Sequence, residues 1–577
     1  MTASIRIDKS VPMELRDGKI LRGDVFRLNS GQKFPAILMR TRYDRMEWQG
    51  NYTSGIMPVV SMVQNGYAIV IQNIRGTYDS EGTMRLDDPF LAVEGPDGYD
   101  SIEWIAAQPW CDGNVGMAGG SFLGPVQWVA AKENPPHLRA IAPWISGSGM
   151  LPSNLNGVLN LGLQIGHLQM DGKNLTDRLE KQGKDVSRMR ELVERGFAHP
   201  EEIYNYLPLK DVPQADFDVI REFWHRSVLN LKVDPKMAEA RPAYEKVTVP
   251  CFHTAGWYDF FTSGTFRNFN SMREKGGSQL ARQGQHLIMG PWLHSGPSGN
   301  GEVGEINFGD QAGVLGSRLA EYNLAFFNKY LKGLDVNLPA IHYFVMGKNI
   351  WQNAEAWPLP QTRWQRFFLH SQGRANTASG DGILSRNQPV NEPPDTFVYD
   401  PHSPVPSTGC RGHGMVGFAS SPKDQSFIAR REDILCYATP ELKQDLEVTG
   451  PLILHLYAAT SARDTDFIAK LVDVYPDGHA YNVTDGIIRA QFRNSILTQQ
   501  FVIPGEVNEY VINMETASQL FKKGHRIRID ISSSNFPEYS RNMNTGNAPG
   551  EDSRGIKAKQ SIFHDASFTS YIDLPVI

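Results

Sequence analysis

The sequence predicts an α/β domain that is interrupted by a helical insertion and followed by an all-β domain. Over residues 1–143 and 246–356, short apolar runs alternate with helical periodicity, which is typical of a sheet covered by helices. Residues 144–245 show long helical windows and few strand-like runs, so we interpret them as an inserted cap. Residues 357–577 contain many short alternating segments separated by turn residues, which favours a jelly roll.

Length and composition agree with this division. A chain of 577 residues is too long for one hydrophobic core, because single cores stop growing at roughly 250–300 residues. Hydrophobic residues at 41% and charged residues at 21% are ordinary for a folded globular protein. The formal charge of −6, with no stripe of lysine and arginine, argues against a nucleic-acid partner.

The sequence also bears on compartment and cofactors. The N-terminal segment has no apolar run after a basic start, and no stretch approaches the ~18 apolar residues of a membrane helix. We therefore expect a cytoplasmic protein without a membrane partner; the oligomeric state stays open, with a homodimer as one alternative. The cysteines lack the paired spacing of a zinc or redox site, so we expect buried thiols and no metal. They are Cys111, Cys251, Cys410 and Cys436.

The first part of the α/β domain begins with strands. Residues 5–28 alternate apolar and polar side chains around Asp17-Gly18, which predicts a hairpin. Residues 35–39 and 67–71 are uniformly apolar, as expected of inner strands that are covered on both faces. Residues 99–107 then place their apolar side chains on one face of a predicted helix.

The α/β pattern resumes after the insertion. Strand-like runs return at 247–255 and 286–289, and helical spacing returns at about 318–331. In the all-β domain the clearest alternating segments are 364–369, 446–457, 467–474, 509–514 and 526–532.

A candidate nucleophile lies between a predicted strand at 115–118 and a predicted helix. The residues between them are Gly119-Gly120-Ser121, and glycines beside a serine permit the backbone angles of a sharp turn that exposes the hydroxyl. The helix would begin near Phe122, whose N–H is placed to donate to a developing oxyanion.

The turn by itself is a weak signal. A typical nucleophile elbow has glycine two residues after the serine, whereas this chain has Leu123 there and Gly124 one position later. Since Gly-Gly-Ser turns are common, Ser121 needs the support of a base and a carboxylate, because a serine hydroxyl is a poor nucleophile at neutral pH.

Chain order supplies that support. In α/β-hydrolases the acid and the histidine follow the serine, each in a loop after a later strand. Asp259 follows the strand-like run that ends near Ala255, and His294 follows the run at 286–289. A helix cap for Asp259 and an ordinary loop position for His294 are the alternatives when each residue is taken alone. Together with Ser121, they predict a triad of nucleophile, base and orienting carboxylate.

The sequence resembles the cocaine esterase and X-prolyl dipeptidyl-peptidase group of serine hydrolases. The resemblance rests on WCDGNVGM at 110–117 leading into GGSFLG at 119–124, AGWYD at 255–259, GPWLHS at 290–295 and RYD at 42–44. In that family the glycine stands three residues after the serine, as Gly124 does. The family implies an α/β-hydrolase core with a helical cap and a C-terminal jelly roll, and detailed likeness covers the core only.

The resemblance also implies a second oxyanion donor and bears on the substrate. The family uses a tyrosine hydroxyl, which corresponds to Tyr43; from the residues alone, Tyr43 would be a packed residue at the strand end. The family's usual tyrosine after the nucleophile is Phe122 here, which matters little if only the N–H serves. Four aromatic residues are pocket candidates, with core packing as the alternative for each: Trp144, Phe260, Phe261 and Trp292.

Three functions follow as alternatives. The first is cleavage of a small carboxylic ester through an acyl-enzyme, without a cofactor. The second is an amidase, acylase or X-Pro-type aminopeptidase with the same triad. The peptidases of the family carry an additional N-terminal region, and its amino ester hydrolases usually have glutamate where Leu123 stands, so both differences favour a plain ester. The third is a non-catalytic binding protein, against which the complete triad order argues.

Overall fold

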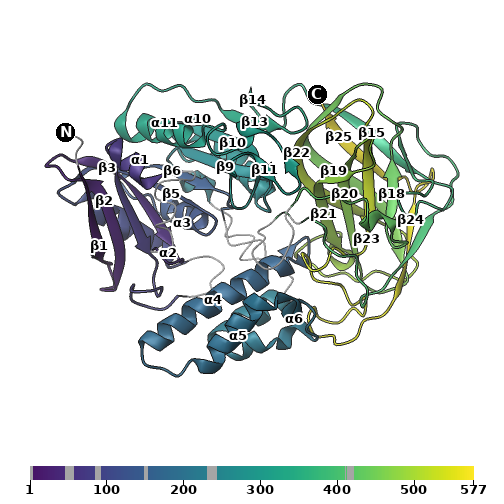
Figure 1. Cartoon of the computed structure of the whole chain (residues 1–577), viewed down its shortest axis with the longest axis horizontal. Helices are drawn as coiled ribbons and strands as arrows, with labels where there is room; N and C mark the ends of the chain where they lie inside the picture. Colours follow the sequence, from purple (N-terminus) through teal and green to yellow (C-terminus); the bar gives the residue numbers. More distant parts are fainter. Residues whose placement is uncertain are drawn as a thin grey trace.

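The computed structural model describes residues 4–45, 57–84, 92–148, 154–229, 243–409, 411 and 421–577. Figure 1 shows a sheet domain at the N-terminal end, an all-β domain at the C-terminal end, and a group of helices below the region where the two meet. The predicted fold class is confirmed: the chain combines an α/β-hydrolase core, a helical cap and a C-terminal all-β domain.

The sheet domain is built on a ten-stranded sheet with the order β1-β2-β4-β3-β5-β6-β9-β10-β13-β14. The antiparallel pair β1 and β2 is the hairpin predicted around Asp17-Gly18, and the strands from β4 to β13 run parallel. The strands are β1 (Ile5–Glu14), β2 (Ile20–Leu28), β3 (Phe34–Thr41), β4 (Ala68–Asn73), β5 (Cys111–Gly120), β6 (Leu138–Trp144), β9 (Cys251–Tyr258), β10 (Gln285–Leu293), β13 (Ile341–Val345) and β14 (Ile350–Ala354).

Helices cover both faces of this sheet, and this explains why its inner strands are apolar throughout. In β4, Ile69 and Ile71 join one buried cluster, whereas Ala68 and Val70 join the cluster on the opposite face. The first cluster includes side chains of α1 (Val59–Gln64) and α11 (Leu319–Lys332). The second includes α2 (Glu94–Ala106), α3 (Leu123–Lys132), α9 (Thr262–Lys275) and α10 (Gln279–Gln283).

The structure changes one helix boundary. Helix α2 begins at Glu94, five residues before the predicted start at 99. Its first turns contain Gly95 and Gly98, which pack closely against α3. A Cβ atom at Gly98 would lie 2.6 Å from the Cβ of Ala130 in α3, so the two helices approach closely only with glycine there. The sequence pattern obscures this first turn because glycine is a poor helix former.

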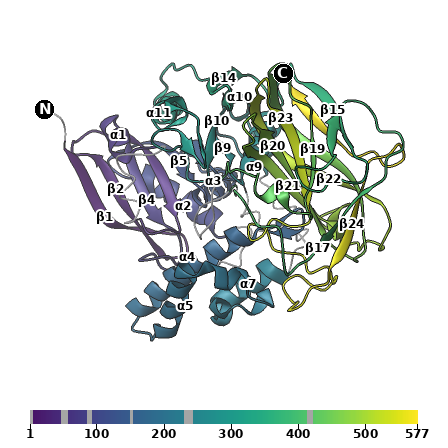
Figure 2. The ribbon, with the colours of Figure 1, turned by 45° about the vertical axis from the view of Figure 1, so that its right-hand side comes forward.

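The cap consists mainly of α4 (Leu161–Lys181), α5 (Ser187–Ala198), α6 (Pro200–Tyr204) and α7 (Asp218–Leu229). One side of α4 carries Leu161, Ile165 and Leu168, which pack with Trp224 of α7. The same cluster includes Phe492 and Phe536 of the all-β domain. The cap therefore contacts the C-terminal domain through a shared apolar core, as the adjacent ribbons in Figures 1 and 2 also indicate. Within the described residues, no helix is both long and apolar enough to cross a bilayer.

The C-terminal domain is formed by strands only, apart from short 3-10 turns, in the part of the chain that the structure describes. All five alternating segments predicted here lie in strands. These are β15 (Arg363–His370), β19 (Leu446–Thr460), β20 (Asp466–Val474), β22 (Asn508–Phe521) and β23 (Arg526–Ser532). Further strands are β16 (Ile383–Ser385), β17 (Asp395–Tyr399), β18 (Leu435–Ala438), β21 (Ala480–Arg489), β24 (Ala558–Phe563) and β25 (Tyr571–Val576).

The core of this domain continues into the sheet domain. One buried cluster joins Leu454 and Ile529 of the β-domain with Trp257 of β9 and Tyr343 of β13. The boundaries after residues 143, 245 and 356 stay predictions; the nearest strand ends are Trp144 of β6, Cys251 of β9 and Ala354 of β14. Cys111, Cys251 and Cys436 are buried free thiols, and Cys410 lies outside the described residues.

Candidate active site

Ser121 lies on a sharp turn between β5 and α3. Its φ angle is 54°, in the left-handed region that non-glycine residues seldom adopt. The Ser121 N–H donates to the carbonyl of Trp144 at the end of β6 (3.1 Å), which holds the strained turn against the neighbouring strand. This strand, turn and helix arrangement is the one predicted from the sequence, and strained backbone of this kind is concentrated at functional sites.

The glycine at the third position after Ser121 has a packing reason. A Cβ atom at Gly124 would lie 1.8 Å from Oγ of Ser146, so the helix can pass the end of β6 only with glycine at this position. Leu123, which occupies the place where other nucleophile elbows have glycine, is buried and lies against Gly119. The point at which α3 approaches the chain after β6 is therefore Gly124, one residue later than the glycine of a typical nucleophile elbow.

Asp259 and His294 meet because two parallel strands end side by side. In the pairing of β9 with β10, Tyr258 lies opposite Leu293, so the residues that follow them leave the sheet together. His294 Nδ1 is 3.1 Å from Oδ1 of Asp259, and His294 Nε2 is 2.9 Å from Oγ of Ser121. The structure thus brings the three predicted residues into one row of hydrogen bonds.

The row is protected from water. Asp259 is 0% exposed and His294 is 1% exposed, so their electrostatic interaction is screened less than it would be at the surface. The ring of Phe260 stacks on the imidazole of His294, with centroids 4.4 Å apart, and the ring of Phe261 lies 5.6 Å from it. The Phe261 N–H also donates to Oδ1 of Asp259 (3.0 Å). Two of the predicted pocket aromatics therefore enclose the histidine.

The two tryptophans proposed for the pocket have different positions. Trp144 lies beside the nucleophile turn, since a Cβ atom at Gly120 would contact its Nε1 at 2.1 Å. Trp292 is 0% exposed, packs in the core of the sheet domain, and donates its Nε1–H to the carbonyl of Ala312 (2.7 Å). Trp292 is a core residue with a satisfied indole, and we therefore leave it out of the pocket.

Tyr43 lies beside Phe122, the first residue after the nucleophile. Its half-buried ring packs against a small cluster formed by Ile74, Phe122 and Val126. The side chain of Asn73 donates to the carbonyl of Tyr43 (2.8 Å), which fixes the backbone of the loop after β3. The Tyr43 hydroxyl makes no hydrogen bond to another described residue.

A polar row on the cap helix was missed in the sequence. Gln164, His167 and Asp171 occur at helical spacing along α4, next to its apolar side, and all three are buried. Asp171 forms an ion pair with Arg42, and the Arg42 guanidinium lies over the ring of Phe122 at 5.3 Å. The spacing of i, i+3 and i+7 was the available signal, but Arg42, the partner of Asp171, is 129 residues distant and could not be identified from a helical pattern.

His167 is the middle residue of this polar row and is buried. Burial lowers the pKa of His167 well below its usual value, and the positive charges of Arg42 and His294 lower it further. His167 is therefore a neutral imidazole at physiological pH. The cap thus contributes a buried, neutral imidazole to the polar side of α4.

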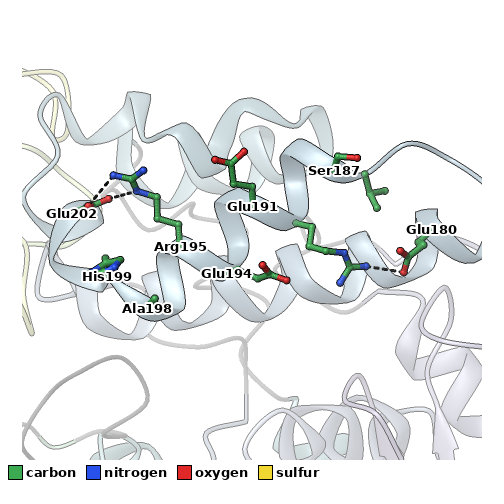
Figure 3. Close-up of a pocket in the computed structure, with 10 residues that line it drawn as sticks. Glu180, Ser187, Glu191, Glu194, Arg195, Ala198, His199 and Glu202 are labelled. Atoms are coloured by element: carbon green, nitrogen blue, oxygen red, sulfur yellow. Dashed lines mark hydrogen bonds and ion pairs between the residues drawn. The ribbon is translucent and has the colours of Figure 1, made fainter.

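A separate groove of about 800 Å³ lies on the cap, between the end of α4 and α5, and is drawn in Figure 3. Ion pairs bridge it, including Arg195 with Glu202 (2.6 Å) and Arg190 with Glu180 (2.7 Å). These side chains are largely exposed, and exposed ion pairs contribute little free energy. The groove includes none of Ser121, Asp259 and His294, so it is a surface feature and not the candidate active site.

The fold and the hydrogen-bonded row define a serine hydrolase of the α/β-hydrolase class. Residues 17–296 match the family described as X-Pro dipeptidyl-peptidase (S15 family), and residues 335–573 match the X-Pro dipeptidyl-peptidase C-terminal non-catalytic domain. The chain is also 33% identical to the cocaine esterase of Rhodococcus sp. (strain MB1 Bresler), with 99% of this chain and 98% of that protein aligned. The chain belongs to the S15 family of serine hydrolases.

Solved structures support the same architecture. An α-amino acid ester hydrolase superposes with a TM-score of 0.78 at 23% identity, covering 100% of this chain and 97% of that one. An aminopeptidase from a marine sediment Thaumarchaeota archaeon superposes with a TM-score of 0.79 at 22% identity, with the same coverage. At such identities the likeness shows the common fold alone.

Proposed function

We propose that this protein cleaves a carboxylic ester of a small organic molecule through an acyl-enzyme on Ser121. The observation that carries the proposal is the unbroken row from Ser121 Oγ to His294 Nε2 (2.9 Å) and from His294 Nδ1 to Asp259 (3.1 Å). A serine hydroxyl needs a base within hydrogen-bond reach and a carboxylate that orients this base, and the row provides both.

Acylation begins when Oγ of Ser121 attacks the ester carbonyl while Nε2 of His294 accepts the hydroxyl proton. The carbonyl oxygen becomes an oxyanion, for which we propose the Phe122 N–H and the Tyr43 hydroxyl as donors. The negative charge of Asp259 stabilises the imidazolium and keeps Nδ1 protonated. When the tetrahedral intermediate collapses, the C–O bond breaks and the imidazolium gives its proton to the departing alcohol.

Deacylation repeats these steps with water. His294 takes a proton from the water molecule, whose oxygen attacks the acyl carbon, and the same donors hold the second oxyanion. The ester bond to Ser121 then breaks, Oγ recovers its proton from the imidazolium, and the carboxylic acid leaves.

Two observations favour an ester over a peptide with a free N-terminus. The relative that aligns over nearly the whole chain is named for esterase activity. On the polar side of α4, the carboxylate of Asp171 is already paired with Arg42, and Leu123 is apolar, so neither is available to an α-ammonium group. Phe260, Phe261 and Trp144 surround the turn and the histidine with aromatic surface suited to an uncharged substrate.

Labelling with a fluorophosphonate probe tests the nucleophile. We expect wild type to be labelled at Ser121, and Ser121→Ala to lose both the label and ester hydrolysis. Ser295→Ala is the matched control, because Ser295 is exposed and directly follows His294. Equal labelling of Ser121→Ala and wild type would show that Ser121 is not the nucleophile.

A panel of substrates tests the ester preference. Aryl esters, amides and X-Pro anilides should give turnover mainly with the esters, and preference for the anilides would favour the peptidase alternative.

A further inference from the structure

A strained glutamate interrupts strand β22 of the C-terminal domain. Along the pairing of β19 with β22, Pro451 lies opposite Thr516 and Ile453 opposite Asn513, so Met514 and Glu515 together face the single residue Leu452. This is a β-bulge, and Glu515 has a φ angle of 66°. The side chain of Asn513 accepts the Glu515 N–H (2.9 Å) and holds the bulge. Bulges of this kind turn a side chain away from its regular direction, often next to active sites.

The bulge directs the Glu515 carboxylate to the start of a helix in the other domain. Oε2 of Glu515 accepts the backbone N–H of Ser263, the second residue of α9, at 2.9 Å. Helix α9 has no capping side chain of its own at Phe261 and no acidic residue in its first turn. A helix begins with free N–H groups and a positive dipole end, so a carboxylate stabilises it there. Glu515, which is 5% exposed, supplies this carboxylate from the C-terminal domain.

The capped turn is the one that holds Asp259. The Phe261 N–H donates to Oδ1 of Asp259 (3.0 Å), the same oxygen that faces His294. The hydroxyl of Thr262 lies 2.6 Å from the carbonyl of Asp259, and its N–H donates to this carbonyl at 3.3 Å. The position of the first turn of α9 therefore sets the position of the carboxylate relative to the imidazole.

A buried arginine keeps the glutamate in place. Nη1 of Arg411 is 3.8 Å from Oε1 of Glu515, and Nη2 is 2.5 Å from Oδ1 of Asp485. Burial alone would lower the pKa of Arg411, but the charges of Asp485 and Glu515 raise it above its usual value. Arg411 therefore stays positively charged and attracts Oε1 of Glu515, while Oε2 accepts the N–H of Ser263.

From this geometry we propose that Glu515 is a positioning residue for the reaction. It fixes the first turn of α9 and thereby holds Asp259 at the distance from which Asp259 orients His294. The inference rests on the proposed role of Ser121, His294 and Asp259. It also gives the C-terminal domain a part in catalysis, although no residue of that domain touches the row of hydrogen bonds among the described contacts.

Steady-state kinetics of Glu515→Ala, Glu515→Gln and Glu392→Ala in the full-length protein test the proposal. Glu392 is the matched control, because it also accepts a backbone N–H, that of Ser371, but lies entirely within the C-terminal domain. Fluorophosphonate titration normalises each kcat to the number of folded active sites. An aryl ester that wild type hydrolyses serves as substrate.

We expect kcat of Glu515→Ala to fall about 10- to 100-fold with KM within about twofold, since small displacements of catalytic groups have effects of this size. The acid limb of its kcat/KM profile should move to lower pH, because a displaced Asp259 supports the imidazolium of His294 less. Glu515→Gln should keep most of the activity, since its amide oxygen can still accept the N–H of Ser263.

Two results would overturn the proposal. One is a kcat for Glu515→Ala within twofold of wild type. The other is an equal loss of kcat per active site in Glu392→Ala, which would show that any damage to this domain lowers the rate. If Ser121→Ala is inactive, either result contradicts only the role of Glu515, and Ser121 is still supported as the nucleophile. An active Ser121→Ala would contradict the proposed function itself.

Discussion

Asp171 of the cap helix and Arg42 of the loop after β3 form an ion pair in which both side chains are buried. The same guanidinium lies over the ring of Phe122, the residue whose N–H is the proposed oxyanion donor, and Arg42 precedes Tyr43, the second proposed donor. The pair therefore links the cap to the segments that carry the two proposed oxyanion donors. Through Asp171, the polar side of α4 binds the loop after β3 in addition to covering it.

Removal of one partner of this pair should reduce both stability and rate. We expect Asp171→Ala to destabilise the protein by about 3–5 kcal/mol, because it leaves a buried guanidinium without a counter-charge. We also expect a lower kcat, since Arg42 would move away from Phe122. Urea unfolding and ester kinetics measure the two effects. The double variant Arg42→Met/Asp171→Leu, which removes both charges, should recover much of the stability, and an unchanged Asp171→Ala would show that the pair contributes nothing.

The carboxylate of Asp259 should be needed for rate and not for substrate binding. Asp259→Asn keeps the shape of the side chain but loses the charge that stabilises the imidazolium, so we expect kcat to fall about 10⁴-fold. KM should change little, since Asp259 is 0% exposed and does not touch substrate. Stopped-flow measurement of the acylation burst checks this. A variant that acylates as fast as wild type would remove Asp259 from the proposed mechanism.

The oxyanion donors can be separated by a pair of aromatic exchanges. Tyr43→Phe removes only the hydroxyl, and we expect kcat to fall about 10²- to 10³-fold with a small change in KM. Phe122→Tyr retains the backbone N–H and should be close to wild type in kcat. If Tyr43→Phe has the activity of wild type, the second donor is another group and the ring of Tyr43 has a packing role.

The residues of the candidate site could be predicted from the sequence because each follows a recognisable strand. Ser121 comes directly after β5, Asp259 after β9 and His294 after β10, and parallel strands bring their following loops to the same edge of a sheet. The glycine-flanked turn, the chain order and the family resemblance together therefore indicated which of many polar residues would meet. The shift of glycine from the position of Leu123 to Gly124 was visible in the sequence, but its cause, the close approach to Ser146, required the structure.

Contacts between domains could not be predicted in this way. The alternation of apolar and polar residues was visible from 509 to 514, whereas strand β22 continues to Phe521. The pattern breaks at Glu515 because the bulge there changes which face of the sheet each later residue occupies. A break in alternation indicates the end of a strand and a bulge equally well. Similarly, the pairing of Asp171 with Arg42 joins residues of two domains, and nothing in either segment specifies its partner.

The buried pair of His564 and Asp395 should make the stability of the C-terminal domain depend on pH. Nε2 of His564 is 2.9 Å from Oδ2 of Asp395. Burial alone would lower the pKa of His564, but the hydrogen bonds and charges of Asp395 and of Glu392, whose Oε2 is 3.1 Å from Nδ1, outweigh it, so the pKa lies above its usual value. A histidine whose pKa is raised by folding stabilises the folded state fully below its unfolded pKa of about 6.5, and this contribution disappears as pH rises through the folded pKa.

The unfolding free energy of wild type should therefore be higher than that of His564→Gln, and this difference should be larger at pH 6 than at pH 9. Urea unfolding of both proteins at the two pH values measures this difference. His479→Gln is the control, because His479 lies in an exposed turn of the same domain, beside the carboxylate of Asp477. Since Asp395 also accepts hydrogen bonds from Ser371 and Tyr437, the carboxylate keeps partners in the His564 variant, so the measured change reports the imidazolium. A difference in unfolding free energy that is equal at pH 6 and pH 9 would show that folding does not raise the pKa of His564.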